Sequence, residues 1–294
     1  MLNAKLPLGV HVEKAIDWMT ANFAGFFSVI RKGLLGIIES IDWVLSAIPL
    51  FVFIVAVVFL AWWVAGRGTA IFTAVGLLLI NNLGLWGKML LTLSMVSTAT
   101  LIALVVGLPL GILMAKNGTA NKIIRPVLDF MQTMPAFVYL IPAVYFFDLG
   151  EVPGTVATII FAMPPVVRLT NLGIRQVPED VVEAARAFGS TPAQLLFKVQ
   201  MPLAVPTIMA GLNQTIMLSL SMVVISAMIG ADGLGKTVYE GITQMNIGKG
   251  FEGGLAVVIL AMLLDRITQC LGSEQKKSGK NFVRKRMERR SQIN

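Results

Sequence analysis

Reactive and charged side chains are scarce in this sequence of 294 residues. Its single cysteine, Cys270, excludes a disulfide within the chain, and we expect this thiol to be a packing residue rather than a reactive one. The single histidine, His11, leaves no cluster of metal ligands and no Ser/His/Asp arrangement, so neither a metal site nor a membrane enzyme is indicated. Only 14% of the residues are charged, against roughly a quarter in soluble proteins, which excludes an ordinary soluble fold.

Apolar residues make up 56% of the chain, and they are grouped in long runs. A helix needs roughly 20 such residues to cross about 30 Å of hydrocarbon. The second of the predicted spans is the weakest, because Asn81 and Asn82 interrupt it. The chain is therefore predicted to be an all-α membrane protein with about seven transmembrane helices, at residues 48–66, 69–87, 89–115, 131–149, 153–170, 203–229 and 254–270.

The first 47 residues precede these spans and form a separate segment. Charged residues come before any long apolar run, so the pattern of a secretory signal peptide is missing and we expect the segment to remain in the mature chain. Its apolar residues recur every three or four positions, which predicts an amphipathic helix. Such a helix can lie in the membrane interface or pack against the spans, and the pattern does not separate the two.

Basic residues alternate between the connections of the predicted spans, and they predict the orientation of the chain. The connections with few basic residues, near Asp148 and at 230–253, are expected outside. The N-terminus is then outside and the C-terminus cytoplasmic; without the weak second span the N-terminus would change side. The predicted cytoplasmic connections carry Lys116, Lys122 and Arg125, then Arg168, Arg175, Arg186 and Lys198, and finally the tail 271–294.

The basic tail accounts for much of the formal net charge of +8. Because it directly follows a predicted span, the charge indicates a cytoplasmic anchor and not a nucleic-acid site. Binding to anionic lipid head groups, with a response to ionic strength, is the alternative.

Residues 178–202 form a polar segment between two apolar runs, and they carry the clearest functional signal. Pro178 and the two acidic residues after it favour the start of a helix, and Gly189 favours its end. Thr191 then begins a capping box for a second helix, which we expect Pro202 to end or kink. The sequence therefore predicts two short helices joined by a glycine elbow.

The same segment matches a known motif. It reads Glu183-Ala184-Ala185, three residues, Gly189, nine residues, and then Val199-Gln200-Met201-Pro202. This spacing resembles the EAA loop of permease subunits in binding-protein-dependent ABC importers, with valine and methionine in place of the usual isoleucine and leucine. The resemblance implies that a coupling helix docks into a partner ATPase through Glu183, Ala184, Ala185, Gly189 and Pro202. An ordinary amphipathic loop is the alternative.

Stretches outside this motif narrow the resemblance. Residues 128–142, 161–178 and 194–230 look like the permease of glycine betaine/proline uptake systems, the quaternary-amine branch of these importers. The likeness implies a type I ABC importer transmembrane domain at 88–270, accessory helices at 48–87, and import of a compatible solute for osmoprotection across a bacterial plasma membrane. It also implies a homodimer of permeases, two ATPase subunits that bind ATP and Mg, and an external substrate-binding protein, with no cofactor in this chain.

A second motif is interpreted as a coincidence. Residues 230–237 read GADGLGKT and match the Walker A formula, with Gly230, Gly235, Lys236 and Thr237 at its fixed positions. The formula binds phosphate only where a strand leads into the loop and a helix leaves it. Here a run of more than 20 apolar residues precedes the loop, and the charge pattern places it outside. We therefore expect a glycine-rich turn and no nucleotide site.

Polar and aromatic residues inside the predicted spans are candidates for a translocation path. Asn213, Gln214, Thr215 and Ser219 form a polar stripe in one span, and hydrogen bonding between helices is an equally good interpretation. Tyr139 and Tyr145 belong to an aromatic cluster that is more typical of packing. The spans 89–115 and 203–229 contain no ionisable residue, which argues against a stand-alone channel or ion-coupled carrier.

Glycine betaine is the substrate that the resemblance implies. Choline and carnitine are the alternative substrates.

Overall fold

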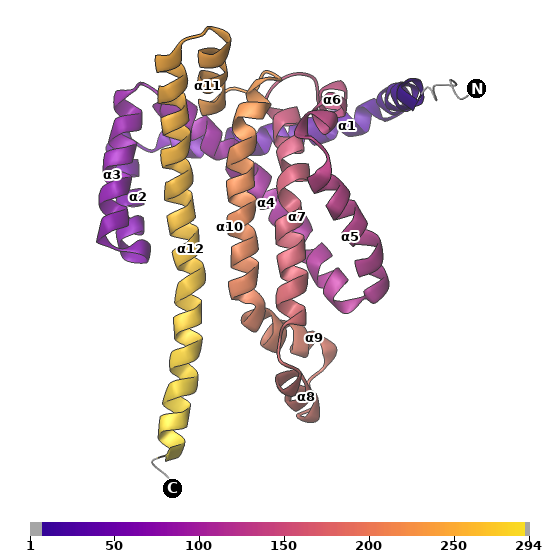
Figure 1. The fold of residues 1–294 in the computed structure, drawn as a ribbon, viewed down its shortest axis with the longest axis vertical. Helices are drawn as coiled ribbons and strands as arrows, with labels where there is room; N and C mark the ends of the chain where they lie inside the picture. The colour runs from indigo at the N-terminus through magenta and orange to yellow at the C-terminus, as the bar shows by residue number, and fades with distance from the viewer. Residues whose placement is uncertain (1–7, 292–294) are drawn as a thin grey trace, which may run out of the picture.

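The structure, a computed structural model, describes the backbone of residues 8–291 and the side chains of residues 9–270. Every regular element in this part of the chain is a helix, as Figure 1 shows. Before the central bundle come α1 (Leu8–Ala47), α2 (Leu50–Ala65) and α3 (Arg67–Asn82). The remaining elements are α4 (Trp86–Lys116), α5 (Gly118–Thr133), α6 (Ala136–Phe147), α7 (Glu151–Arg175), α8 (Glu179–Ala187), α9 (Pro192–Gln194), the π-helical segment η1 (Leu195–Gln200), α10 (Met201–Ala227), α11 (Leu234–Thr243) and α12 (Ile247–Ser291).

Helix α7 is the centre of the bundle, where it packs between α4 and α10. Glycines make both contacts close. On α4, Gly107 and Gly111 face α7, and a Cβ added at Gly111 would lie 2.7 Å from the carbonyl oxygen of Val167. On α10, a Cβ at Gly211 would lie 3.1 Å from the Cα of Val166. Small residues at such positions let helix backbones approach in a membrane, where packing drives association.

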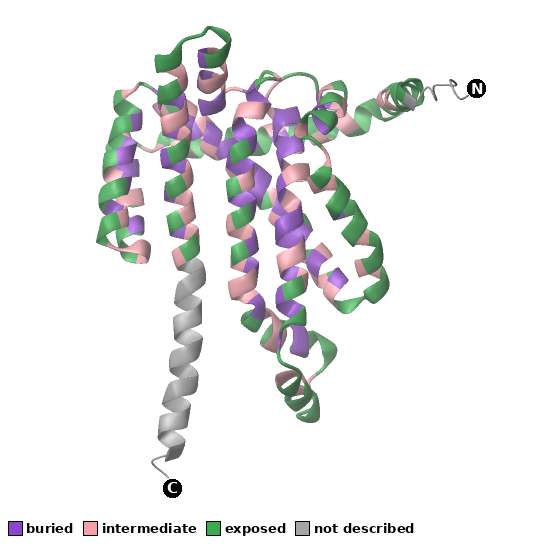
Figure 2. Cartoon of the chain, viewed as in Figure 1, coloured by how far each residue is buried: buried purple, intermediate pink, exposed green. Residues whose placement is uncertain are grey.

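The burial pattern fits a bundle surrounded by lipid. Buried residues concentrate on α4, α7 and α10, while the outer faces of α2, α3, α5 and α12 are exposed (Figure 2). The exposed face of α2 is strongly apolar, and a tryptophan and two phenylalanines on it, Trp63, Phe51 and Phe59, are each more than half exposed. Apolar side chains on the outer surface are expected where hydrocarbon and not water surrounds the protein.

The predicted spans are confirmed for α4, α7, α10 and α12. By length and composition, five helices in the described residues can cross a membrane, or up to six if one bent pair is a single span. The fifth is α1, the N-terminal segment that was predicted as an amphipathic helix. The predicted spans 48–66 and 69–87 form instead a hairpin of two 16-residue helices, α2 and α3, each about 24 Å long.

The span predicted at 131–149 is not one continuous helix. The chain forms α5 and α6, which are bent by 97° at the break between them. Pro135 precedes α6 with an extended backbone and has no N–H to continue the hydrogen bonds of α5. A proline also disfavours helical geometry in the residue before it, and Met134 is extended. The apolar run therefore continues through a point at which the backbone turns.

Helix α1 packs against the bundle, which confirms one of the two alternatives for the N-terminal segment. It lies across the end of the bundle that is remote from α8 (Figure 1). The ring of Phe27 stacks on Phe146 of α6 with 4.3 Å between centroids, and Ile38 is almost fully buried. Arg31 forms an ion pair with Asp148, at the end of α6. The outward side of α1 is exposed.

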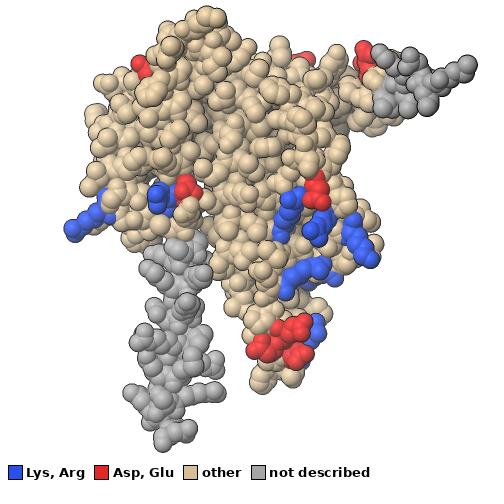
Figure 3. All heavy atoms as spheres, viewed as in Figure 1, with Lys and Arg blue, Asp and Glu red and all other residues tan. Residues whose placement is uncertain are grey.

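Charged side chains are distributed along the bundle in a pattern typical of a membrane protein. In Figure 3, lysines and arginines form a band near the end that carries α8, and the surface above this band is almost free of charge. Basic residues gather at the cytoplasmic boundary of membrane proteins, and charged residues avoid the hydrocarbon. The side chains of the predicted basic tail lie outside the described residues.

We expect Gly111→Ala to destabilise the bundle. The added methyl would meet Thr170 at 2.6 Å and the Val167 backbone at 2.7 Å, so α4 and α7 must separate. Overpacking of this kind costs about 1–3 kcal/mol. Thermal unfolding of the purified protein measures the loss. Gly87→Ala on the same helix is the control, because a Cβ added there meets nothing within 4 Å. Equal unfolding temperatures for the two variants would contradict the close packing of α4 and α7.

Candidate functional site

The segment that follows α7 projects from one end of the bundle (Figure 1). Helix α8 starts at Glu179, directly after Pro178. Glu179 and Asp180 lie in its first turn, where their negative charges stabilise the helix by interacting with the positive end of its dipole. None of its residues is buried. A short helix stays exposed along its length only if other contacts fix its ends. The elbow after α8 and the packing of η1 provide them.

The elbow is a Schellman motif built on Gly189. The N–H of Ser190 donates to the carbonyl of Ala185 at 3.1 Å, and the N–H of Gly189 donates to the carbonyl of Arg186 at 2.9 Å. Gly189 has a φ of +78°, a left-handed conformation that glycine adopts without a steric penalty. The predicted glycine end of the first helix is therefore confirmed in its hydrogen bonds.

A capping box starts the second helix one residue later. The N–H of Gln194 donates to the Thr191 hydroxyl at 3.3 Å, and the N–H of Thr191 donates to the Gln194 side chain at 2.9 Å. Pro192 occupies the first turn, as predicted. The motif that ends α8 and the motif that begins α9 thus lie within a few residues of each other. Together they fix the angle between the two helices.

Of the two outcomes predicted for Pro202, an end or a kink of the second helix, the structure excludes the end. The helical path runs without a break from Pro192 to Ala227. Between Leu195 and Gln200 it widens into the π-helical segment η1, and Pro202 lies at the start of α10. An α-helical proline clashes with the carbonyl four residues earlier. We attribute the continuity of the helix to the widened turn, which makes room for the ring.

Leu196 connects this segment to the bundle. Its side chain is 3% exposed and packs in a cluster with Ile174 of α7 and Ala204 and Ile208 of α10. Residues of α4, including Ile112, pack against the same cluster. A displacement of η1 must therefore be accompanied by α4, α7 and α10, because tightly packed side chains transmit displacement.

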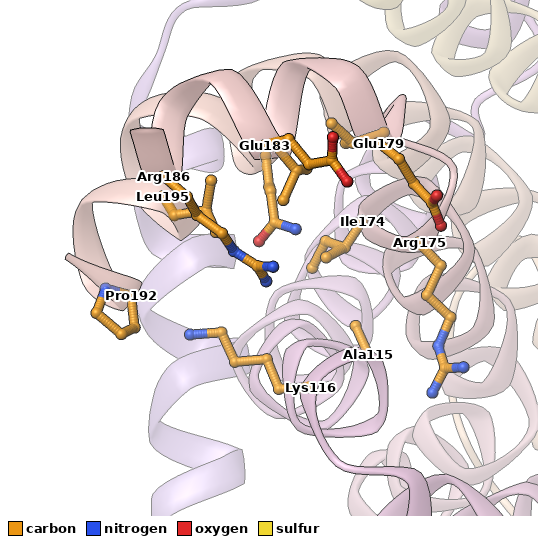
Figure 4. Close-up of a pocket in the computed structure, with 12 residues that line it drawn as sticks. Ala115, Lys116, Ile174, Arg175, Glu179, Glu183, Arg186, Pro192 and Leu195 are labelled. Atoms are coloured by element: carbon orange, nitrogen blue, oxygen red, sulfur yellow. The ribbon is translucent and has the colours of Figure 1, made fainter. Parts of the chain in front are cut away.

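A cavity of about 650 Å³ lies between α8 and the end of the bundle (Figure 4). Its wall includes Lys116 at the end of α4 and Glu183 and Arg186 of α8. The side chains of Arg186 and Lys116 extend into the cavity from opposite sides. Arg175 donates instead to the carbonyl of Met114 at 2.7 Å and joins α7 to the end of α4. The cavity separates α8 from the bundle. The face of α8 toward the bundle is therefore accessible, as is its outer face.

The tip of the elbow presents an aromatic residue that was not predicted from the sequence. Phe188 is 91% exposed and lies between Ala187 and Gly189, which are also exposed. A fully exposed phenylalanine beside small residues is unusual on a polar helix and indicates a contact surface. Its position directly before the helix-ending Gly189 was the available signal, because the chain leaves the helix at that point.

The predicted polar stripe of α10 does not form one surface. Asn213 bonds to α12, where it donates to Asp265 at 2.8 Å and accepts from Thr268 at 2.5 Å. Thr215 and Ser219 are fully buried, and Gln214 is exposed. Within the single chain, the interpretation as hydrogen bonding between helices therefore describes Asn213.

The two candidate tyrosines lie on different sides of α6. Tyr139 is buried against Ala157 of α7 and Met222 of α10. Tyr145 is 58% exposed and lines a cavity of about 580 Å³ together with Asp148 and Leu149. Only Tyr145 therefore presents its ring to the outside of the chain.

The Walker-like turn follows the 27-residue helix α10 and is filled by protein groups. The N–H of Leu234 donates to Thr92 at 2.8 Å, and the N–H of Gly233 donates to Asp232 at 2.7 Å. Gly235, in the first turn of α11, packs against α10 so closely that an added Cβ would clash with the carbonyl of Val223. These glycines serve close packing, and the geometry supports the interpretation as a turn.

The polar side chains of that turn are also engaged. Lys236, of the Walker-like motif, forms an ion pair with Asp232 at 3.3 Å, and Thr237 accepts a hydrogen bond from Lys88 at 2.9 Å. Burial alone would raise the pKa of Asp232, but the Gly233 N–H and the Lys236 ammonium outweigh it and hold this pKa below its usual range. Both the lysine and the threonine of the motif thus have partners within the chain.

Comparison with known proteins places the chain among transport components. The family described as "Binding-protein-dependent transport system inner membrane component" matches residues 107–274. The glycine betaine transport system permease protein OpuAB of Bacillus subtilis is 52% identical, over 94% of this chain and 98% of that protein. The glycine betaine/carnitine transport permease protein GbuB of Listeria monocytogenes is 54% identical, over 92% and 97%.

Two further similarities extend the comparison. The glycine betaine/proline betaine transport system permease protein ProW of Escherichia coli is 49% identical, over 93% of this chain and 77% of that protein. A solved structure of inward-facing conformations of the MetNI methionine ABC transporter matches with a TM-score of 0.59 at 23% identity, over 63% of this chain and 92% of that chain. At this identity the structural match supports the fold alone.

We expect Leu196→Ala to lower the stability of the protein, because it removes the side chain that joins η1 to the bundle. A buried leucine reduced to alanine costs about 2–5 kcal/mol. Leu203→Ala, at a side chain that is 53% exposed, is the matched control and should unfold like the parent protein in thermal denaturation. A small and equal effect of both substitutions would show that η1 is not anchored as described.

Proposed function

This chain belongs to the family of binding-protein-dependent transport system inner membrane components, and we propose that it is the permease of an ATP-driven importer for glycine betaine or a related compatible solute. It is a multi-pass inner membrane protein. The observation that carries the proposal is the exposed elbow after α8. A Schellman motif and a capping box fix this elbow, and Leu196 joins it to three helices of the bundle.

The substrate assignment is supported by the relatives. OpuAB, GbuB and ProW all carry glycine betaine in their names, and each is about half identical to this chain over more than nine-tenths of its length. Carnitine and proline betaine also occur among these names. We propose glycine betaine as the principal solute, imported for osmoprotection, with carnitine and choline as the competing candidates.

The coupling role is proposed for Glu183, Ala184, Ala185, Gly189 and Pro202. The first three lie on α8, where no side chain is buried, and Gly189 fixes the elbow. Pro202 lies where η1 passes into α10. A partner that moves α8 would therefore move α4, α7 and α10 as well. Coupling requires such a connection, because movement of the partner must be converted into movement of the membrane helices.

The energy source is proposed to be a separate subunit. ATP and Mg would be bound by two ATPase subunits that contact α8, and no nucleotide site is assigned to this chain. In the Walker-like turn the amides of Gly233 and Leu234 already have partners within the protein. Because the amide N–H groups of a phosphate loop must be free to bind phosphate, this supports the proposal.

The assembly is proposed to be a homodimer of permeases that receives solute from an external binding protein. The end that carries α8 would be cytoplasmic, which agrees with the band of basic side chains at that level in Figure 3. The N-terminus would be outside and the C-terminus in the cytoplasm. Of the candidate path residues, Gln214 and Tyr145 are exposed and remain proposed contacts with the solute.

The proposed function predicts saturable uptake of labelled glycine betaine after osmotic upshift. Cells without their own osmolyte importers would receive this permease with its ATPase and binding protein, and unlabelled choline, carnitine and proline would compete. We expect uptake to disappear when the ATPase is inactivated. Uptake that continues without an active ATPase would instead identify a channel or ion-coupled carrier.

Substitution of Gly189 tests the coupling segment. Gly189→Val should abolish most uptake, because a β-branched residue at a φ of +78° is strained by at least about 1–2 kcal/mol and the elbow must open. Gly189→Asn is the control, since asparagine tolerates the left-handed conformation and nothing lies within 4 Å of the added Cβ. Uptake and surface expression are measured together. Normal uptake by correctly inserted Gly189→Val would count against the coupling role.

A further inference from the structure

A cavity of about 360 Å³ lies between the α2–α3 hairpin and α12, away from the α8 segment. It is lined by Gly68, Thr69 and Phe72 of α3 and by Met262 and Arg266 of α12. The hairpin stands beside α12 in Figure 1. Close packing fixes this arrangement, because a Cβ added at Gly76 would lie only 2.6 Å from the side chain of Ile259. The cavity thus lies between two elements that pack closely two turns farther along α3.

Arg266 is the charged residue of this cavity, and it forms no hydrogen bond or ion pair within the described part of the chain. Oδ1 of its neighbour Asp265 accepts from Asn213 at 2.8 Å and from Gln269 at 2.7 Å. The carboxylate beside Arg266 is therefore directed to other partners. Arg266 is exposed at the end of an apolar helix, and its guanidinium can therefore bind an anion.

The opposite wall supplies further donors. Helix α3 begins after Gly66 without a side-chain cap, and its first intrahelical hydrogen bond runs from the N–H of Ala70 to the carbonyl of Gly66 at 3.2 Å. The N–H groups of Gly68 and Thr69 precede this bond and remain available. They support the guanidinium of Arg266, since amides at a helix start and a nearby arginine both favour an anion.

The rest of the wall is apolar and partly open. Phe72 is 37% exposed and Met262 is 50% exposed, and both border the cavity. Arg266 lies near the C-terminal end of the apolar stretch predicted at 254–270 on α12. The turn between α2 and α3 lies at the height of the basic band in Figure 3. The cavity therefore has an anion-binding part at the membrane boundary and an apolar part that continues toward the hydrocarbon.

We propose that this cavity binds an anionic phospholipid, with its phosphate against Arg266 and the start of α3 and an acyl chain along Phe72 and Met262. Basic pockets between transmembrane helices on the cytoplasmic side commonly hold such head groups. A soluble phosphate would use only the first half of the site, and the apolar half favours a lipid. The inference depends on the membrane location of the chain and not on the transported solute.

Native mass spectrometry of the full complex tests the proposal. The complex is extracted from bilayers of phosphatidylglycerol and phosphatidylcholine in equal amounts, and the lipids retained by each permease chain are counted. We expect selective retention of phosphatidylglycerol. Arg266→Gln should reduce its affinity about fivefold, the factor that corresponds to one basic side chain near an anionic lipid.

A second variant and a control distinguish lipid binding in this cavity from non-specific attraction between anionic lipid and basic side chains. Gly68→Trp places an indole in the cavity from α3 and retains Arg266. A Cβ at position 68 meets nothing within 4 Å, so the fold should tolerate the change and the lipid should be lost. Arg125→Gln removes an exposed arginine of α5 outside the cavity and should change nothing. Retention by both cavity variants, an equal loss in Arg125→Gln, or displacement of the lipid by inorganic phosphate would each overturn the proposal.

Discussion

The close approach of α7 to α4 and α10 is the constraint on which the rest of the structure depends. Glycines on the two outer helices, Gly111 and Gly211, bring backbones together without intervening side chains. In lipid there is no hydrophobic force between helices, so this packing must hold the bundle. Because closely packed helices transmit displacement to one another, a partner attached at a single point can act on all three.

The attachment point follows from local backbone chemistry. The Schellman motif at Gly189 and the capping box at Thr191 set the angle of the elbow, and Leu196 buries the next turn among residues of α7 and α10. Force applied to the exposed Phe188 and the neighbouring alanines would therefore reach the membrane helices through packed side chains. The α2–α3 hairpin and α1 are not part of this connection. The hairpin lies at the side of the bundle, and α1 lies across the end that is remote from α8.

The parts of the fold that could be predicted are those encoded by neighbouring residues. Gly189 and the Thr191 capping box need only a few positions, and the long apolar runs of α4, α7 and α10 follow from composition. The bend at Pro135 does not follow from hydropathy, which continues through it while the backbone turns. Pro202 does not end the helix, because the π-helical turn before it makes room for the proline ring. The partners of Asn213 depend on α12, which no local pattern reveals.

The measurement that tests the central claim most directly is photo-crosslinking in the assembled complex. A photoreactive residue replaces Phe188 at the elbow or, separately, Trp43, which is 73% exposed on α1 at the remote end. The account predicts a covalent adduct between the permease and the ATPase subunit from position 188 and none from position 43. An ATPase adduct from position 43, with none from position 188, would show that force enters the bundle elsewhere.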